Sequence, residues 1–346
     1  MTSSLQEEIF EQPIALQRLL DSQSGVIQKI ADAVRERQPR FVVIAARGSS
    51  DNAARYAQYL FGAHHQLLVA LATPSLFTLY GSPPRMTDSL VIAISQSGQS
   101  PDILAVVDEG KKQNAFTLAL TNDTASPLAD LADHVIDLCA GPEKSIGATK
   151  TYTTSLLALA MLSAYLSADK TQRALLDDVP AFVSHSLSPL EFIAAIARKY
   201  TSSHACVVLG RGYNYSTAFE IALKIKELAY IPAEPYSSAD FQHGPVALVE
   251  EGFPVVAVIP EGKTQPELIT LLRTLKPRNP ELVVISSSNE ALKLATSPIA
   301  IPANIPEWIS PMIAIVPAQQ LALDLALARG FNPEEPRGLN KVTRTR

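Results

Sequence analysis

Cysteine and aromatic residues are scarce in this chain of 346 residues. It has 2 cysteines and 1 tryptophan, and aromatic residues make up 6% of the sequence. Two cysteines cannot build the disulfide framework of a small secreted domain. Both stand in apolar, strand-like runs, so we expect Cys139 and Cys206 to be buried as small hydrophobic residues in a reducing compartment.

Positive charge and long apolar runs are also lacking. The chain has 29 Lys and Arg against 34 Asp and Glu, so no basic field is present to hold nucleic acid or anionic lipid. The longest apolar run, residues 156–166, is shorter than the ~20 residues that a membrane helix needs. The first residues are polar and acidic, unlike a secretory signal. We therefore expect a soluble, cytoplasmic protein.

Strand-like and helical patterns alternate along the first half of the chain. Helical spacing covers residues 5–38, a segment ending near Tyr59, residues 101–112 and residues 151–167. Apolar runs typical of strands cover residues 41–46, 67–70, 90–94, 117–120 and 135–138. This alternation predicts an α/β fold in which helices cover both faces of a parallel sheet.

The second half repeats this pattern at an offset of about 165 residues. Strands are expected at 205–210, 254–259 and 282–286, and a long Ala/Leu-rich helix near 310–328 matches the one at 151–167. We predict two tandem doubly wound subdomains, each a parallel five-stranded sheet flanked by helices. The expected boundaries are N-terminal helices (1–38), a first subdomain (39–168), a helical connector (169–200), a second subdomain (201–330) and a C-terminal tail (331–346).

Hydroxyl side chains follow two strands of the first subdomain. Ser95, Gln96, Ser97 and Ser100 come after the strand at 90–94, and Ser50 follows the strand at 41–46. Such a corner, with a helix N-terminus behind it, suits a phosphate, although a Ser-rich helix cap explains it as well. The matching corner of the second subdomain, residues 260–264, carries a proline and a carboxylate instead. We expect one phosphate site per chain, in the first subdomain.

Charged residues interrupt an apolar helix in the second subdomain. Lys224 and Glu227 are three residues apart and so share a helix face. They form either a solvated ion pair or a pair used in chemistry. His243 stands in a loop with Gly244 and Pro245, from which an imidazole can point outward and share acid and base work with a carboxylate.

The other histidines and Lys341 of the C-terminal tail can be explained by a structural or surface role as well as by a functional one. The remaining histidines have no such setting and are interpreted as structural or surface residues: His64, His65, His134, His185 and His204. Lys341 lies either in a frayed basic tail or in an ordered tail that delivers an amine to a site.

Taken together, six stretches resemble the sugar-isomerase (SIS) superfamily. The likeness extends over nearly the whole chain to the isomerase half of glutamine–fructose-6-phosphate aminotransferases, and the chain is similar to stand-alone glucosamine-6-phosphate deaminases. The stretches are 46–50, 95–100, 147–150 with Thr153 and Thr154, 222–227, 243–245 and 336–341.

The resemblance implies roles for particular residues. Ser50, Ser95, Gln96, Ser97 and Ser100 would hold the sugar phosphate, with Arg47, Gly48, Ser49, Ile146 and Ala148 as possible substrate contacts. Glu227 would move a proton between C1 and C2, and Lys224 would stabilise the enolate charge. His243 would assist ring opening from a neighbouring subunit, which implies a homodimer, and Lys341 would form a Schiff base. Arg47 and Ala148 replace a Cys and a Ser of the family pattern.

The length of the chain leaves no residues for the glutaminase domain of those aminotransferases, so we expect free ammonia or water in place of glutamine. The first hypothesis is deamination of glucosamine 6-phosphate to fructose 6-phosphate and ammonia. The alternatives are a deglycase for fructosamine 6-phosphates such as fructoselysine 6-phosphate, an aldose–ketose phosphate isomerase, and a catalytically silent sugar-phosphate sensor. No cofactor is expected, and no metal, because no His/Asp/Glu cluster has ligand spacing.

Overall fold

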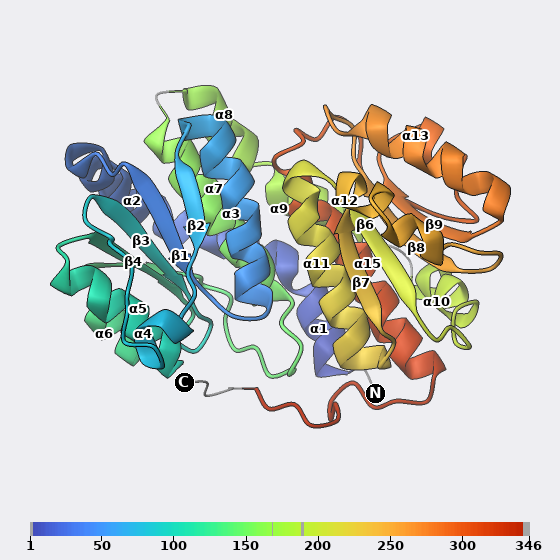
Figure 1. Ribbon diagram of the computed structural model, residues 1–346, viewed down its shortest axis with the longest axis horizontal. Helices are drawn as coiled ribbons and strands as arrows, with labels where there is room; N and C mark the ends of the chain where they lie inside the picture. Colours follow the sequence, from blue (N-terminus) through green and yellow to red (C-terminus); the bar gives the residue numbers. More distant parts are fainter. Residues whose placement is uncertain (1–2, 168, 188–189, 342–346) are drawn as a thin grey trace. The chain divides into compact units, whose positions relative to one another are not determined.

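The computed structural model describes residues 3–167, 169–187 and 190–341 (Figure 1). They form two compact units, each built on one sheet. The first-sheet unit consists of Gln12–Glu143, Lys150–Pro180 and the chain from Asn340 on. The second-sheet unit consists of the chain up to Glu11, Lys144–Thr149 and Ala181–Leu339. The units therefore interleave in sequence, whereas the predicted boundaries run consecutively.

The first-sheet unit holds a parallel five-stranded sheet in the order β2-β1-β3-β4-β5. Its helices α2, α3 and α7 pack together, and α4, α5 and α6 form a second group (Figure 1). Its elements are α2 (Gln12–Arg37), β1 (Phe41–Ala45), α3 (Ser49–His65), β2 (Leu68–Leu71), α4 (Ser75–Thr78), β3 (Ser89–Ile94), α5 (Pro101–Lys112), β4 (Phe116–Thr121), α6 (Pro127–Leu131), β5 (His134–Asp137), α7 (Lys150–Leu166) and α8 (Lys170–Leu176).

The second-sheet unit holds a sheet of the same topology, in the order β7-β6-β8-β9-β10. Its elements are α1 (Ser4–Phe10), most of α9 (Val179–Ser186), α10 (Leu190–Arg198), β6 (Cys206–Gly210), η1 (Gly212–Asn214), α11 (Tyr215–Lys224), η2 (Ile225–Ala229), β7 (Ala233–Ser237), α12 (Ser238–Gln242), η3 (Pro245–Leu248), β8 (Pro254–Ile259), α13 (Gln265–Leu275), η4 (Lys276–Arg278), β9 (Glu281–Ser286), α14 (Asn289–Leu292), β10 (Ser297–Ala300) and α15 (Ser310–Ala328).

The predicted duplication is confirmed strand by strand. Strands β1 and β6 begin at Phe41 and Cys206, and β4 and β9 begin at Phe116 and Glu281, so each pair is separated by 165 residues. Each unit has its own apolar core, one under β1, β3 and β4 and the other under β6, β8 and β9. The doubly wound α/β prediction, with two five-stranded parallel sheets, therefore holds.

The edge strands β7 and β10 were not among the predicted elements. Each contains a proline, Pro235 in β7 and Pro298 in β10. Burial alternates along β10, and β7 has three partly or fully exposed residues between its two buried ends. Proline removes a backbone donor and is confined to edge strands, so these segments lack the continuous apolar run of a central strand. The predicted N-terminal helices are α1 and α2, which are separated at Glu11.

Helix α15 is longer than the apolar run at 156–166 that the sequence singled out. Its 19 residues have the length and hydropathy of a membrane span. Among the described residues, it is the one unbroken helix with both properties. However, 83% of that stretch is buried inside the protein, where α15 packs against α10 and α11. Burial of this kind is typical of the core helix of a doubly wound unit.

The two cysteines differ from each other. Cys206 is buried in β6 as predicted, and burial raises the pKa of its thiol to about 12. The prediction for Cys139 is wrong: it follows β5, has a left-handed backbone with φ +51° and is only half-buried. Its Sγ lies 3.2 Å from Ser22 Oγ, so the apolar run ends one residue earlier than the sequence suggested.

Asp324 in α15 gives the second-sheet unit a pH-dependent stability. Its Oδ2 is buried without a hydrogen-bond partner among the described residues, and burial raises the pKa of Asp324 to about 6 despite the attraction of Arg198. The folded protein therefore binds a proton more tightly than the unfolded chain, so the free energy of unfolding falls as pH rises from about 4 to about 6.

Asp324→Asn should remove that fall and stabilise the unit at pH 7.5 by on the order of 1 kcal/mol, after allowance for the partial exposure of the carboxyl. Urea unfolding at pH 5 and pH 7.5, followed by the fluorescence of the single Trp308 in the same unit, measures both effects. An unchanged difference between the two pH values in the variant would assign the pH dependence to other groups.

Candidate active site

The predicted phosphate corner lies where the strand order of the first sheet reverses. Strands β1 and β3 are adjacent and parallel, with Ala45 paired to Ala93, and the chain leaves β1 toward β2 on its other side. Helices α3 and α5 begin directly beyond these two strands. In doubly wound sheets such a switch point, with two helix N-termini at the carboxyl ends of the strands, is the usual ligand site.

The turn after β3 is tightly fixed. Gly98 has φ +60°, and a Cβ at this position would lie 2.1 Å from Ser126 Oγ, so only glycine fits. Ser95 Oγ accepts a hydrogen bond from Gly98 N at 3.2 Å. Ser100 is the N-cap residue of α5, yet its side chain makes no capping hydrogen bond. The helix-cap explanation therefore does not account for Ser100, and its hydroxyl can serve a ligand.

Arg47 connects the two halves of this corner. Its Nε donates to Asp102 Oδ2 at 2.8 Å and its NH2 lies 2.8 Å from the same oxygen, while the Asp102 side chain is fully buried. Arg47 directly precedes Gly48, Ser49 and Ser50, and Asp102 lies in the first turn of α5. The ion pair thus fixes a guanidinium, 52% exposed, at the rim of the corner.

Removal of that guanidinium is expected to weaken anion binding. Arg47→Ala should raise the dissociation constant of inorganic phosphate about tenfold, since one charge-assisted hydrogen bond contributes roughly 1.5–3 kcal/mol and Asp102 offsets part of it. A titration followed by phosphorus NMR measures this. Arg40→Ala is the matched control. It removes an exposed cation that directly precedes the start of β1, whereas Arg47 follows the end of that strand. Equal affinities for the two variants would exclude Arg47 from the anion site.

The corresponding corner of the second-sheet unit is filled by the chain itself. The Glu307 carboxylate accepts hydrogen bonds from Lys263 N at 2.8 Å, Thr264 N at 3.2 Å and Thr264 Oγ1 at 2.6 Å. A Cβ on Gly262 would lie 2.4 Å from Glu307 Cδ. An internal anion therefore caps α13 where the first sheet leaves room for a ligand, in agreement with the interpretation of residues 260–264.

Lys224 and Glu227 form the ion pair that their spacing suggested. Lys224 Nζ lies 2.6 Å from Glu227 Oε2 and 3.5 Å from Glu220 Oε1. The side chains of Lys224 and Glu220 are 2% and 0% exposed, whereas Glu227 is 23% exposed. The helix changes from α to π geometry at Ile225, and such π turns are frequent at functional sites. The pair is not a solvated surface bridge: it combines a buried cation with a carboxylate that a ligand can reach.

The loop 144–149 lies against this pair. A Cβ on Gly147 would be 3.7 Å from both Lys224 Nζ and Glu227 Oε2. Burial alternates along the loop, so Ile146 and Ala148 remain partly exposed between buried neighbours. Both residues are thus placed beside the Lys224–Glu227 pair, where a substrate contact is possible.

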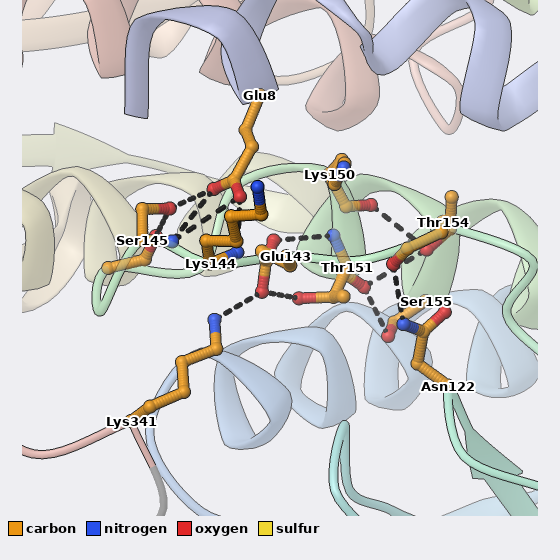
Figure 2. A network of polar contacts seen from close by, with 12 residues as sticks. Glu8, Asn122, Glu143, Lys144, Ser145, Lys150, Thr151, Thr154, Ser155 and Lys341 are labelled. Carbon is orange, nitrogen blue, oxygen red and sulfur yellow. Dashed lines mark hydrogen bonds and ion pairs between the residues drawn. The ribbon is translucent and has the colours of Figure 1, made fainter. Parts of the chain in front are cut away.

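Lys341 has a partner that the sequence did not suggest. Its Nζ donates to Glu143 Oε2 at 2.8 Å, and Glu143 also accepts from Thr151 N at 3.1 Å and Thr151 Oγ1 at 2.8 Å (Figure 2). The Glu143 side chain is fully buried. The tail is therefore ordered as far as Lys341, as the second of the two interpretations requires, while residues 342–346 lie outside the described residues.

The preceding part of the tail is fixed within the second-sheet unit. Arg337 N donates to the Tyr230 hydroxyl at 2.8 Å, and the Arg337 guanidinium stacks 4.7 Å from the Tyr230 ring. Tyr230 has φ +54° and ends the π turn that carries Glu227. The tail thus packs on the same helix end as the carboxylate.

His243 is exposed at the end of α12, followed by Gly244 with φ +136°. The other histidines have structural settings where contacts are seen: His65 Nε2 and His64 Nδ1 lie 2.9 and 3.3 Å from Ser163 Oγ, and His134 stacks on Phe116.

Sequence reasoning predicted Lys224, Glu227, Lys341 and the serine corner as site residues, and it did not name two buried carboxylates that pair with these lysines, Glu220 and Glu143. Glu220 could have been found, because it lies four residues before Lys224 on an apolar helix. Glu143 could not, because the lysine that it binds is 198 residues away.

Comparisons with known proteins agree with this description. Residues 37–165 and 199–329 each match the SIS domain family. The chain is 33% identical over 344 residues, 97% of its length, to a glutamine–fructose-6-phosphate aminotransferase (isomerizing) of Thermococcus kodakarensis, of which it covers 57%. It therefore spans little more than half the length of the curated relatives that it matches.

Two solved structures have the same architecture. A candidate phosphosugar isomerase of Silicibacter pomeroyi is 34% identical, with a TM-score of 0.87 over 96% of this chain and 100% of the other. A glucosamine-6-phosphate deaminase of Thermotoga maritima is 24% identical, with a TM-score of 0.79 over 99% of this chain and 100% of the other, and shows the fold alone. Both sheets of this chain fall within these matches.

Proposed function

This chain belongs to the SIS domain family, with two SIS repeats, and we propose that it is an amino-sugar-phosphate deaminase. The proposed reaction converts glucosamine 6-phosphate and water into fructose 6-phosphate and ammonia. The observation that carries the proposal is the Lys224–Glu227 pair. In this pair, the partly exposed carboxylate of Glu227 lies beside the buried ammonium of Lys224. A ligand held near the loop 144–149 would meet the carboxylate, which can accept a proton.

The proposed chemistry is a proton transfer between neighbouring carbons. We propose Ser50, Ser95, Gln96, Ser97 and Ser100 as the phosphate contacts, and Glu227 as the group that reacts with C1 and C2 of the open-chain sugar. The Glu227 carboxylate takes the proton from C2 and returns it to C1, and Lys224 stabilises the negative charge that develops on the oxygen at C1. The oxygen at C1 gains a proton as the amine at C2 loses one, and the product is an imine at C2. Water adds to this imine, the C–N bond breaks and ammonia leaves.

The Lys341–Glu143 pair supports the proposed Schiff-base role of Lys341. A Schiff base between Lys341 and the C2 carbonyl requires the amine to lose a proton, and the Glu143 carboxylate lies 2.8 Å from that nitrogen. In the direction of deamination, the same lysine can hold C2 while ammonia leaves. We therefore propose Lys341 as a further catalytic residue.

His243 is proposed to assist ring opening in the site of a second copy of the chain. Its support is its exposure at the end of α12. The proposal accordingly includes a cytoplasmic homodimer that acts on a small sugar phosphate and needs no nucleic acid, membrane or cofactor.

The test uses the wild-type protein and the Glu227→Gln variant. Each is incubated with glucosamine 6-phosphate, and ammonia and fructose 6-phosphate are measured by separate coupled assays. The proposal expects both products in equal amounts from the wild type. It is refuted if the wild type releases no more ammonia than the variant.

The same samples distinguish the other functions. Lysine released from fructoselysine 6-phosphate would favour the deglycase, and turnover of an aldose phosphate without release of nitrogen would favour a plain isomerase. Tight binding of sugar phosphates without turnover of any of them would indicate a sensor, which needs the serine corner but not Glu227.

A further inference from the structure

The first helix of the chain is built into the second-sheet unit. Ser3 caps α1, its hydroxyl accepting from Gln6 N at 3.1 Å, and Leu5 and Ile9 are buried where α1 packs on α15. Leu5 N also donates to Glu334 Oε1 at 3.3 Å. The face that buries Leu5 and Ile9 also buries Glu8, which is 4% exposed.

The Glu8 carboxylate is held by the loop 144–149. Ser145 N donates to Glu8 Oε1 and Oε2, both at 3.3 Å, and the Ser145 hydroxyl and Lys144 N donate to it as well (Figure 2). Ser145 Oγ also lies 3.1 Å from Gly147 O. Two consecutive backbone amides and one hydroxyl therefore converge on a single buried charge 136 residues away in the sequence.

The loop held in this way is the one that lies on the catalytic pair. Gly147 follows Ser145 by two residues, and its Cβ position is 3.7 Å from both Lys224 Nζ and Glu227 Oε2. We propose that Glu8 is a positioning residue: through Lys144 and Ser145 it fixes the loop over the Lys224–Glu227 pair and so sets the distance between Glu227 and the reacting carbons. This inference rests on the proposed function, because the rate that it concerns is that of the proposed proton transfer.

A carboxylate suits this position for a physical reason. Buried backbone amides need acceptors, and an ionised carboxylate offers two oxygens whose hydrogen bonds are about twice as strong as those of a neutral acceptor. An amide in its place would offer only one acceptor oxygen. Its NH2 group, itself a donor, would then face the donors of Lys144 and Ser145. The loop would lose part of its fixed position while α1, held by Leu5 and Ile9, stays packed.

The test replaces Glu8 by Gln and, as the matched control, the exposed neighbour Glu7 on the same helix by Gln. Displacement of reacting groups by about 1 Å can cost 10²-fold in rate, so Glu8→Gln should lower kcat by about 10- to 100-fold. KM for glucosamine 6-phosphate should change less than about threefold, because the phosphate corner lies in the first-sheet unit. Glu7→Gln should keep both constants.

Amide hydrogen exchange gives a second readout that needs no turnover. The amides of Lys144 and Ser145 should exchange at least about tenfold faster in Glu8→Gln than in the wild type, while those of β6 and β8 stay protected. Ser145→Ala, which removes one of the donors and keeps the Glu8 charge, should lower kcat by a smaller factor.

The outcomes separate the two proposals. Wild-type kcat in Glu8→Gln, with an active wild-type protein, overturns the role of Glu8 alone. A matching fall in kcat together with loss of protection throughout β6 and β8 overturns it too, because Glu8 would then act on the fold. A wild type without turnover overturns the proposed function and the effect of Glu8 on rate with it, and exchange at Lys144 and Ser145 then decides whether Glu8 orders the loop.

Discussion

Glu227→Gln is expected to form fructose 6-phosphate and ammonia about 10³-fold more slowly than the wild-type protein. A carboxamide cannot carry a proton between C1 and C2, and general acid–base catalysis typically contributes 10²- to 10⁴-fold. The substitution is nearly isosteric, and its amide oxygen can still accept from Lys224 Nζ, which lies 2.6 Å from Glu227 Oε2. Because 23% of the Glu227 side chain is exposed, the variant should fold as the wild type does.

Two measurements separate loss of chemistry from loss of binding. KM for glucosamine 6-phosphate should stay within about threefold of the wild-type value, since the phosphate contacts are unchanged. In deuterated water, the wild type should incorporate deuterium at C1 of the product to the extent that the proton on Glu227 exchanges with solvent before it is returned, and the variant should not do so on the same timescale. Glu251→Gln, an exposed carboxylate of the same unit, is the control and should match the wild type.

A variant that keeps more than a tenth of the wild-type kcat would contradict the role of Glu227. Loss of turnover with a KM raised by orders of magnitude would contradict it as well, because Glu227 would then hold substrate. In either case another carboxylate must carry the proton, and the buried Glu143 beside Lys341 becomes the group to test.

Short-range patterns in the sequence predict the central strands of the two sheets, whereas they do not predict the edge strands β7 and β10. Strands such as β3, buried along its whole length, show the continuous apolar run of a parallel sheet covered on both faces. Strand β10 alternates between buried and exposed residues and starts beside Pro298, so nothing local distinguishes it from a loop. Its place in the sheet follows from pairing with β9, in which each partner residue lies 14 residues earlier in the sequence.

The candidate site was predictable where its groups are neighbours in sequence. Lys224 and Glu227 lie three residues apart on an apolar helix, and that spacing predicts the ion pair, in which Nζ and Oε2 are 2.6 Å apart. The π turn that carries Glu227 could not be predicted, because it depends on a shift in backbone hydrogen bonds rather than on residue type. Glu8 and Glu143 escaped prediction because their partners, Ser145 and Lys341, are 137 and 198 residues away.

Lys224 contributes to stability as well as to chemistry. Its side chain is 2% exposed and lies 3.5 Å from Glu220, whose side chain is fully buried, and 2.6 Å from Glu227. Lys224→Met keeps the apolar stem and removes the ammonium, so two carboxylates lose their shared cation. Breaking a buried ion pair by removing one partner typically costs 3–5 kcal/mol. We expect Lys224→Met to lower the free energy of unfolding of the second-sheet unit by about that amount and to reduce turnover severely.

Urea unfolding followed by Trp308 fluorescence measures the loss, since Trp308 and Lys224 belong to the same unit. Lys226→Met, two residues along the helix and exposed, is the matched control and should change the free energy of unfolding by less than about 0.5 kcal/mol. Adding Glu220→Gln to Lys224→Met removes the uncompensated charge, and the double variant should recover much of the lost stability without recovering turnover. If Lys224→Met alone costs less than about 1 kcal/mol, the pair behaves as a solvated bridge, and Lys224 is retained for its chemistry alone.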